Sequence, residues 1–301
     1  MRQKKIIIAY IAGLGHSGST LTDLLLGSQQ GVESFGELSM LDKVYRGILA
    51  DGRCTCGERL QACSLWGSVL DSLEGRGLDI AAMKLGHKGY KEITDATFTE
   101  LAARTREGVI VDSSKSTQRL RSILDLPRDR FDLRIIHLVR DGRAVAYSNT
   151  RKGRSFRVWM KRWKKENLEV EALARLSENY IRIRYEDLVA DPRGTVGNLL
   201  AFLDVEPIAD ITLDWTERES HNIGGNRMRR SSEAGITRDD EYVSGVSDRQ
   251  WRQAGEIAGA LLRSYGYEYL PDTRRTAGAF PRMRGPSILK RIRRSLVAQE
   301  R

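Results

Sequence analysis

The sequence predicts an α/β fold of the three-layer, P-loop-like kind, in which helices cover both faces of a mainly parallel central sheet. Short apolar runs rich in β-branched residues, without alternating polar positions, are typical of strands buried on both faces. Segments with helical periodicity separate these runs, and such alternation implies the crossover connections of a parallel sheet. The first run leads directly into a glycine-rich loop that opens a helix.

Apolar runs predict four strands, each of which ends at a turn or a charged residue. They are Ile6–Ala12, Gly108–Asp112, Leu133–Val139 and Tyr180–Tyr185. Helical periodicity predicts the elements that alternate with them and follow them: Thr20–Ser28, a helix from about Ala144, Ser155–Leu176, Pro192–Leu203 and Ser247–Tyr265. In open parallel sheets ligands bind beyond the carboxyl ends of the strands, so functional residues are expected there.

The first strand could pass for a short signal peptide, because Ile6–Ala12 follows the basic segment Met1–Lys5. A buried strand is preferred, since the run ends in the glycine loop and no small-residue cleavage site is suitably placed. Leu21, Leu24 and Leu25 then share one side of the first helix. Nothing approaches the roughly 20 apolar residues of a transmembrane helix, and a cytoplasmic protein is expected.

The chain is expected to form one large domain followed by a basic tail. Its 301 residues, 40% of them hydrophobic, can bury a full core, and no Ser/Gly-rich linker interrupts residues 1–272. Residues 273–301 contain many arginines and lysines but a single acid, Glu300. Apolar residues at near-helical spacing within this tail predict an amphipathic helix in weak contact with an anionic membrane. A solvated tail, or a helix packed on the domain, is the alternative.

The charge balance favours anionic partners. The formal net charge is +10 and the isoelectric point is about 9.6, which suits nucleotide phosphates, nucleic acid or an acidic membrane surface. A nucleic-acid partner is not expected, because the basic residues are scattered or confined to the tail. They are not interleaved with the aromatic side chains on which bases stack.

Three cysteines lie close together in the sequence at Cys54, Cys56 and Cys63. Such a sparse, odd set argues against a disulfide framework and fits a reducing compartment. A structural zinc site has four ligands, and no Cys or His nearby in the sequence supplies the fourth. His87 could be that ligand only if the fold brought it to the cysteines. Reduced structural thiols are therefore expected, with zinc as the alternative, and no metal is expected to be required.

The glycine-rich loop Gly13-Leu-Gly-His-Ser-Gly-Ser-Thr20 has the G-x-x-x-x-G-x-[ST] frame of a P-loop. Its glycines let successive N–H groups face one point at a helix N-terminus, which forms a cradle for an anion. The lysine that a Walker A loop uses for β- and γ-phosphates is absent, and Ser19 stands in its place. This argues against an ordinary nucleotide triphosphatase or kinase; a glycine turn without a ligand is the structural alternative.

Three motifs in order along the chain resemble the sulfotransferases that use 3′-phosphoadenylyl sulfate (PAPS), in particular bacterial members of that superfamily. The 5′-phosphosulfate loop of that family is similar to the segment Gly15, His16, Ser17, Gly18, Ser19, Thr20. Its 3′-phosphate element resembles Leu138–Ser148, which implies that Arg140 and Ser148 contact the 3′-phosphate. Tyr185-Glu-Asp-Leu188, followed by Asp191-Pro192, is a further recurring feature.

Physical chemistry supports the assignment of Arg140, because a guanidinium offers a planar fork that matches phosphate oxygens. The alternative is a surface ion pair with Asp141. Further on, Gly224–Arg230 resembles the late glycine and basic loop that closes over the 3′-phosphate. Arg229 is the first candidate contact there and Arg227 the second, with solvated charge as the alternative.

Sulfuryl transfer resembles phosphoryl transfer, so positioning and cationic stabilisation supply most of the catalysis. Glu37 lies in a segment that resembles the Gly-Glu supplying the general base in tyrosylprotein sulfotransferases. Capping of the following helix is its alternative role, and Glu33 is the backup base. Cytosolic sulfotransferases use a histidine, for which His16 and His87 are the candidates here.

Two further groups are expected to stabilise charge in the transferring sulfuryl group. His16 occupies a loop position where the family more often carries Lys or Arg, and as imidazolium it would face the sulfuryl oxygens. Lys115, after the second expected strand, is the candidate for the leaving oxygen; a solvent-facing lysine is the alternative.

The resemblance implies an enzyme that transfers the sulfuryl group of PAPS to a hydroxyl group of a small-molecule, glycan or lipid acceptor. A P-loop nucleotide kinase or triphosphatase, and a non-catalytic protein that binds nucleotides or anionic surfaces, are the alternatives. The region around Cys54–Cys63 and the helical stretch 155–176 are expected to wall the acceptor site.

Overall fold

The computed structural model describes residues 5–82, 89–105, 108–206, 210–231 and 233–268. His87 and the basic tail 273–301 lie outside the described residues, so the predictions made for them remain predictions. Within the described part of the chain, no helix combines the length and apolar character needed to cross a membrane.

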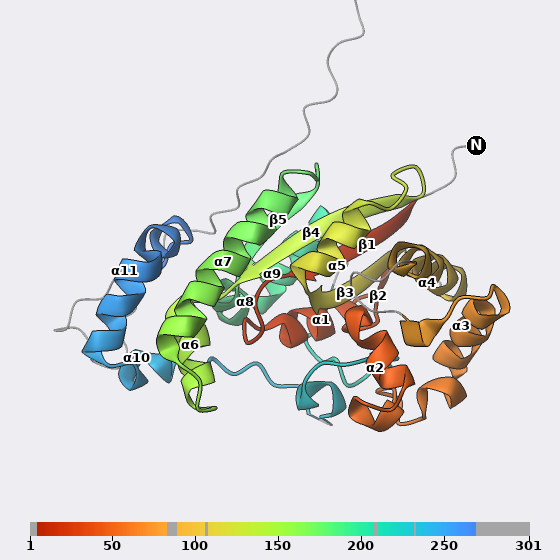
Figure 1. The fold of residues 1–301 in the computed structure, drawn as a ribbon, viewed down its shortest axis with the longest axis horizontal. Helices are drawn as coiled ribbons and strands as arrows, with labels where there is room; N and C mark the ends of the chain where they lie inside the picture. Colours follow the sequence, from red (N-terminus) through yellow and green to blue (C-terminus); the bar gives the residue numbers. More distant parts are fainter. Residues whose placement is uncertain (1–4, 83–88, 106–107, 207–209, 232, 269–301) are drawn as a thin grey trace, which may run out of the picture.

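A five-stranded parallel sheet forms the centre of the molecule, with strand order β2-β3-β1-β4-β5 (Figure 1). The strands are β1 (Ile6–Ala12), β2 (Val32–Ser34), β3 (Val109–Lys115), β4 (Phe131–Val139) and β5 (Tyr180–Arg184). β1 is central, and its Ile8 pairs with Ile110 of β3 on one side and Leu133 of β4 on the other. The predicted α/β fold class is thus confirmed.

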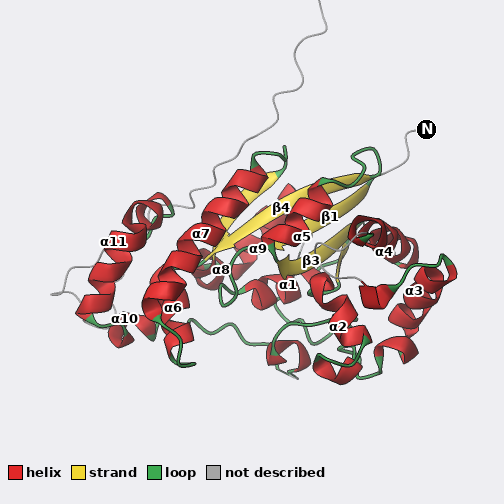
Figure 2. Ribbon diagram, in the orientation of Figure 1, coloured by secondary structure: helices red, strands yellow, loops and turns green. Residues whose placement is uncertain are grey.

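Helices cover both faces of this sheet (Figure 2). Apolar residues of one face pack with α2 (Leu41–Tyr45), α3 (Ser64–Gly75), α4 (Tyr90–Arg104), α5 (Thr117–Leu124) and α7 (Phe156–Ala174). Those of the other face pack with α1 (Ser19–Gly27), α8 (Tyr185–Ala190) and α9 (Pro192–Phe202). A third cluster joins α6 (Gly142–Thr150) and α7 to α10 (Tyr242–Gly245) and α11 (Asp248–Ser264).

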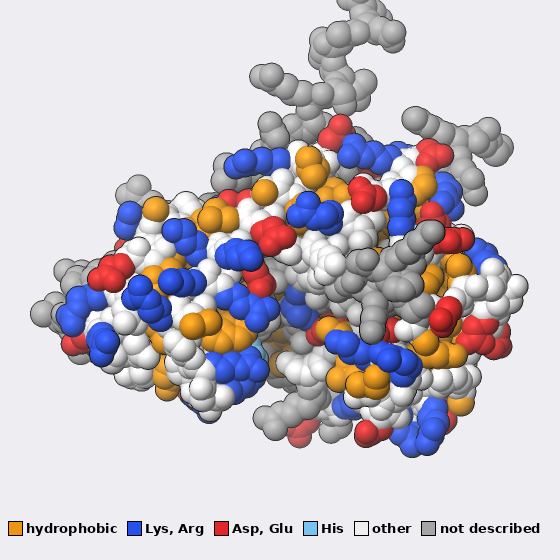
Figure 3. All heavy atoms as spheres, viewed as in Figure 1, with side chains coloured by type: hydrophobic (Ala, Val, Ile, Leu, Met, Phe, Trp, Pro, Cys, Tyr) orange, Lys and Arg blue, Asp and Glu red, His pale blue; other side chains and the backbone are white. Residues whose placement is uncertain are grey.

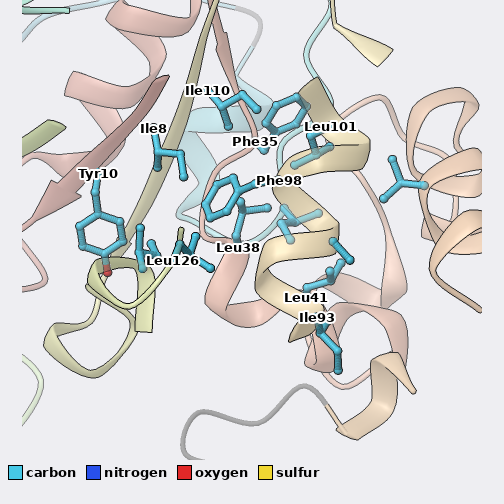
Figure 4. Packing of buried hydrophobic residues seen from close by; sticks show 14 of the residues in the cluster. Ile8, Tyr10, Phe35, Leu38, Leu41, Ile93, Phe98, Leu101, Ile110 and Leu126 are labelled. Carbon is cyan, nitrogen blue, oxygen red and sulfur yellow. The ribbon is translucent and has the colours of Figure 1, made fainter. Parts of the chain in front are cut away.

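The alternation of side chains along β1 divides the core between the two faces. Ile8 and Tyr10 belong to the cluster shown in Figure 4, which also contains Phe98 and Ile110. Ala9 and the other odd-numbered residues of the strand pack against α1 on the opposite face. Every residue from 8 to 12 is buried, which explains why the run is apolar throughout rather than alternating.

The structure adds elements that periodicity did not predict. β2 is only three residues long, and α3, α4 and α5 lie between it and β4 in the chain. In the described part of the chain, five short 3-10 turns connect the elements: Leu38–Met40, Ala50–Gly52, Leu60–Ala62, Ile80–Ala82 and Arg227–Arg230. β3 continues three residues beyond its predicted end, to Lys115, which brings that lysine to the carboxyl edge of the sheet.

Candidate active site

The glycine loop after β1 is held in place by close contacts that only glycine permits. Gly13 has φ +149°, and a Cβ there would lie 2.4 Å from the carbonyl oxygen of Leu138. Gly18 has φ +91°, and a Cβ there would lie 2.5 Å from the ring of Tyr185. Gly15, by contrast, faces open space. The loop is therefore clamped at both ends against β4 and α8 and is open in its middle.

Serine and threonine of the loop begin α1. Ser17, Ser19 and Thr20 are all buried, and Gly18 is the N-cap of the helix in the left-handed conformation. No side chain caps the first turn of α1, so its backbone N–H groups remain directed toward the loop. This is the arrangement in which a helix N-terminus binds an anion.

Cations surround His16 at the mouth of the loop. Lys152, which follows α6, lies with its Nζ 3.1 Å from His16 Nε2. Burial lowers the pKa of His16 below its ordinary value, and the charges of Lys152, Arg140, Arg154 and Lys115 lower it further. The neutral imidazole is therefore favoured at pH 7, and His16 adds no further positive charge to this cluster of cations.

Arg140 follows β4 and reaches back across the loop. Its Nη1 donates to the carbonyl oxygen of His16 at 3.1 Å, and its Nη2 lies 2.9 Å from Oδ2 of Asp239. The guanidinium is buried over the ring of Tyr185, 4.4 Å from its centroid, and among the described residues its Nε has no hydrogen-bond partner. Asp141, the partner considered from the sequence, instead binds Arg143.

The Tyr185-Glu-Asp-Leu motif connects the loop to Arg140. Tyr185 contacts Gly18 and lies under the Arg140 guanidinium. Glu186 accepts a hydrogen bond from the backbone N–H of Asp141 at 3.0 Å and another from the hydroxyl of Tyr267 at 2.8 Å. Burial raises the pKa of Glu186 above its ordinary value. The motif therefore fixes the turn that carries Arg140.

Ser148 lies two turns along α6 and is half-buried. No hydrogen bond joins its hydroxyl to Arg140 within the described part of the chain, so its predicted contact with a 3′-phosphate remains a prediction.

Glu37 and Lys115 meet where β2 and β3 end. Lys115 Nζ donates to Glu37 Oε1 at 2.6 Å and to the carbonyl oxygen of Ser113 at 3.0 Å. Both side chains are about one-sixth exposed, at 15% for Glu37 and 17% for Lys115. Glu37 precedes the 3-10 turn Leu38–Met40, but its side chain makes no capping hydrogen bond there. The carboxylate therefore faces the lysine, not the backbone of the next turn.

A strap of chain from 221 to 225 holds Glu37 in this position. The backbone N–H of Glu37 donates to the carbonyl oxygen of Ile223 at 2.8 Å, and the N–H of Ile223 donates to Phe35 at 3.0 Å. Gly36 and Gly224 allow this approach, since a Cβ on Gly36 would lie 2.3 Å from Ile223 O. The base predicted from the sequence is thus positioned by residues almost two hundred places further along the chain.

Arg229 lies under the loop helix, not in solvent. Its guanidinium pairs with the fully buried Asp23 of α1, and its Nη2 donates to Ser113 Oγ at 2.9 Å. Its Nε and the Oδ1 of Asp23 have no hydrogen-bond partner among the described residues. Arg227 begins the adjacent 3-10 turn. The predicted contacts of these two arginines with a nucleotide remain predictions.

The surface view places this site in its surroundings. Between α6 and α2 the surface is hollowed, and Lys and Arg side chains gather on the side formed by α6 and α7 (Figure 3). Glu33, the backup base, is bound by Arg218 at 2.7 Å. It lines a separate cavity of about 520 Å³ that includes Arg104 and His221. Of the two candidate bases, Glu37 therefore lies beside Lys115, whereas Glu33 lies in the other cavity.

The sequence did not identify the fourth residue beside the cysteines. His221 lies against Cys54 and Cys63, and the ligand atoms of Cys54, Cys56, Cys63 and His221 all lie within 4.8 Å of one another. No Cys or His nearby in the sequence offered a fourth ligand, and the structure brings His221 to the cysteines from 158 residues beyond Cys63. Lys152 and Asp239 were also not predicted, because nothing in their local sequence indicates contact with the loop.

Comparisons with known proteins identify the family and the fold. A model of the sulfotransferase family matches residues 9–210, more than half of the chain. The sulfotransferase domain of the Synechococcus PCC 7002 olefin synthase superposes with a TM-score of 0.55 and 23% identity, covering 90% of this chain and 100% of that one. The sulfotransferase domain from the curacin biosynthetic pathway gives the same score and coverage at 21% identity. A search of curated proteins found no match.

Lys152→Met should raise the pKa of His16, because it removes the nearest of the charges that oppose protonation. The pKa should stay below about 6.5, since burial, the largest cause, is unchanged. NMR titration of the imidazole protons measures this. Lys91→Met, on the exposed side of α4, is the control and should leave the titration unchanged. Identical titrations of His16 in the native and Lys152→Met chains would contradict this arrangement.

The lowered pKa of His16 also makes the stability depend on pH. The unfolded chain takes up this proton more readily than the folded chain does, so the free energy of unfolding falls as the pH falls below about 6.5.

Proposed function

The chain belongs to the sulfotransferase family, and we propose that it transfers the sulfuryl group of PAPS to a hydroxyl group of a small-molecule, glycan or lipid acceptor. The observation that carries this proposal is the pairing of Glu37 with Lys115 beside a glycine loop ringed by cations. A base for the acceptor and a cation for the leaving group are thus adjacent to a cradle for the donor.

The donor supplies an activated sulfuryl group attached to a 5′-phosphate, and the loop 13–20 is proposed to bind that end. Its backbone N–H groups at the start of α1 suit the phosphosulfate charge. His16 and Lys152 stand at the mouth of the loop. Gly15 leaves the space beside them open, which supports a ligand in the middle of the loop.

Arg140 is proposed to bind the 3′-phosphate, with Ser148 and the arginines Arg227 and Arg229 as further contacts. The present partner of Arg140, Asp239, has a side chain that is 52% exposed. A phosphate carrying up to two charges can replace such a partner and offers better matched oxygens to a guanidinium. Support comes from the buried Nε of Arg140, which has no acceptor within the described part of the chain.

Glu37 is proposed to take the proton from the acceptor hydroxyl as that oxygen attacks sulfur. A new bond forms between the acceptor oxygen and sulfur, and the bond between sulfur and the bridging 5′-phosphate oxygen breaks. Lys115 then stabilises the negative charge that develops on the leaving oxygen. The product 3′-phosphoadenosine 5′-phosphate (PAP) keeps that electron pair, so no external base or metal ion is needed for the balance of charge.

The 2.6 Å ion pair between these two residues has a consequence for the order of events. Before the acceptor arrives, the ammonium group of Lys115 occupies the carboxylate of Glu37. An acceptor hydroxyl that binds Glu37 displaces the ammonium group from it, and the freed lysine turns to the sulfuryl donor. Base and leaving-group cation are thereby made available together, only when both substrates are present.

Arg140→Ala should weaken the binding of PAP by about 1.5–3 kcal/mol, the scale of a charge-assisted hydrogen bond. Adenosine 5′-phosphate, which lacks the 3′-phosphate, should bind the variant and the native chain equally well. Isothermal titration calorimetry with both nucleotides measures the difference. Arg151→Ala, directly after α6, is the matched control, because the Arg151 side chain is 62% exposed and pairs with the exposed Glu241. If both nucleotides weaken alike in Arg140→Ala, the arginine is structural.

Glu37→Gln should lower turnover by about 10²–10⁴-fold, the range for losing a general base, while PAP affinity is retained. The measurement is transfer of labelled sulfuryl from PAPS to a panel of hydroxyl compounds. Glu33→Gln removes a neighbouring acid that is already bound by Arg218 and should keep native turnover. Full activity of Glu37→Gln together with loss of activity in Glu33→Gln would move the base to Glu33.

A further inference from the structure

A cluster of four potential metal ligands lies apart from the proposed catalytic pair. It consists of Cys54, Cys56, Cys63 and His221. Nδ1 of His221 lies 3.3 Å from Cys63 Sγ and 3.8 Å from Cys54 Sγ, and Cys56 Sγ lies 3.8 Å from Cys63 Sγ. Four ligands at tetrahedral angles, with zinc–sulfur bonds of about 2.3 Å and zinc–nitrogen bonds of about 2.0–2.1 Å, stand roughly 3.8 Å apart for sulfur pairs and roughly 3.6 Å apart for sulfur and nitrogen. The three separations given above lie within about 0.3 Å of these values, and all four ligand atoms lie within 4.8 Å of one another.

We propose that these four residues bind a structural zinc ion. Three thiolates and one imidazole form a closed tetrahedral donor set, which favours zinc over the oxygen-seeking ions magnesium and calcium. The three cysteines are free thiols, and the 3.8 Å between Cys56 and Cys63 is almost twice the length of a disulfide bond. The set is also complete, with no position left for a substrate.

The polypeptide around the four ligands is rigidly held. Thr55, between two of the cysteines, donates through its hydroxyl to Ser220 O at 2.7 Å and accepts from Asn222 N at 2.8 Å. Trp66 donates from its indole to His221 O at 2.7 Å. The loop and the histidine segment are therefore tied together on both sides of His221, so little rearrangement is needed for binding.

The groups around the ligands suit a bound cation. Trp66 N lies 3.5 Å from Cys63 Sγ at the start of α3, a contact that stabilises a thiolate. The Nε2 of His221 points toward Glu219, whose Oε1 lies 3.7 Å away. A carboxylate near the second nitrogen of a metal-binding histidine favours the tautomer that presents Nδ1 to the metal.

The proposed ion has a defined structural task. His221 opens the strap that continues to Ile223, and Ile223 accepts the backbone hydrogen bond of Glu37. In Figure 1 this strap (teal) passes beside the start of α2. Zinc would fasten the loop 54–63 to the strap and so hold Glu37 opposite Lys115 from outside, without touching either substrate.

The full chain, purified without added metal and without a metal-affinity step, should contain about one zinc per chain by plasma mass spectrometry. Cys56→Ser and His221→Ala should each lose the zinc, whereas Glu58→Gln, an exposed change within the same loop, should retain it. Replacement of zinc by cobalt(II) in the native chain should give the intense visible bands of tetrahedral thiolate coordination.

A second measurement covers variants that fail to fold. Removal of the metal from the native chain with a chelator should lower its melting temperature, and zinc but not magnesium should restore it. Native protein that contains no zinc and takes up no cobalt, with all three thiols free or Cys56 joined to Cys63, would overturn the proposal. PAP binding measured on the same samples keeps this outcome separate from the proposed transfer reaction, because the nucleotide contacts do not include the four ligands.

Discussion

The parallel pairing of β1 with both β3 and β4 is the constraint on which the site depends. Parallel strands present all their carboxyl ends at one edge, so whatever follows each strand is brought to the same place. Each of the five strands supplies one part of the proposed site there: the glycine loop after β1, Glu37 after β2, Lys115 at the end of β3, Arg140 after β4 and Tyr185 after β5. A change in strand order would separate these groups even if every local motif were kept.

The cations of this edge are paired with acids, which we propose the substrates replace. Arg140 is paired with Asp239 and Lys115 with Glu37, and in each pair at least one partner is reached by solvent. Such pairing keeps the basic side chains ordered until a ligand binds. Burying a cation without a partner would instead cost free energy of folding. The pair of Arg229 with Asp23 differs, because both side chains are buried. The proposed binding role of Arg229 would therefore require a larger rearrangement than the one proposed for Arg140.

The local parts of this account were predictable from the sequence, and the long-range parts were not. β1 and the loop after it could be predicted because their local sequence is sufficient: a continuous apolar run forms the strand, and the glycines that follow form the loop. α4 was missed because it buries polar residues, Thr94 and Thr97, which obscure its apolar period. His221 lies 158 residues from Cys63, and Lys152 lies 136 residues from His16. Only the fold brings such pairs together, since nothing in the sequence near either member indicates the other.

Nucleotide selectivity tests the central claim most directly, because the proposed donor carries a 3′-phosphate and no γ-phosphate. Thermal unfolding of the native chain should be measured with PAP, ATP and adenosine 5′-phosphate at equal concentrations. A ligand at 100 times its dissociation constant adds about 2.7 kcal/mol to the free energy of unfolding. PAP should raise the melting temperature much more than either other nucleotide does. Equal shifts with PAP and ATP would contradict it.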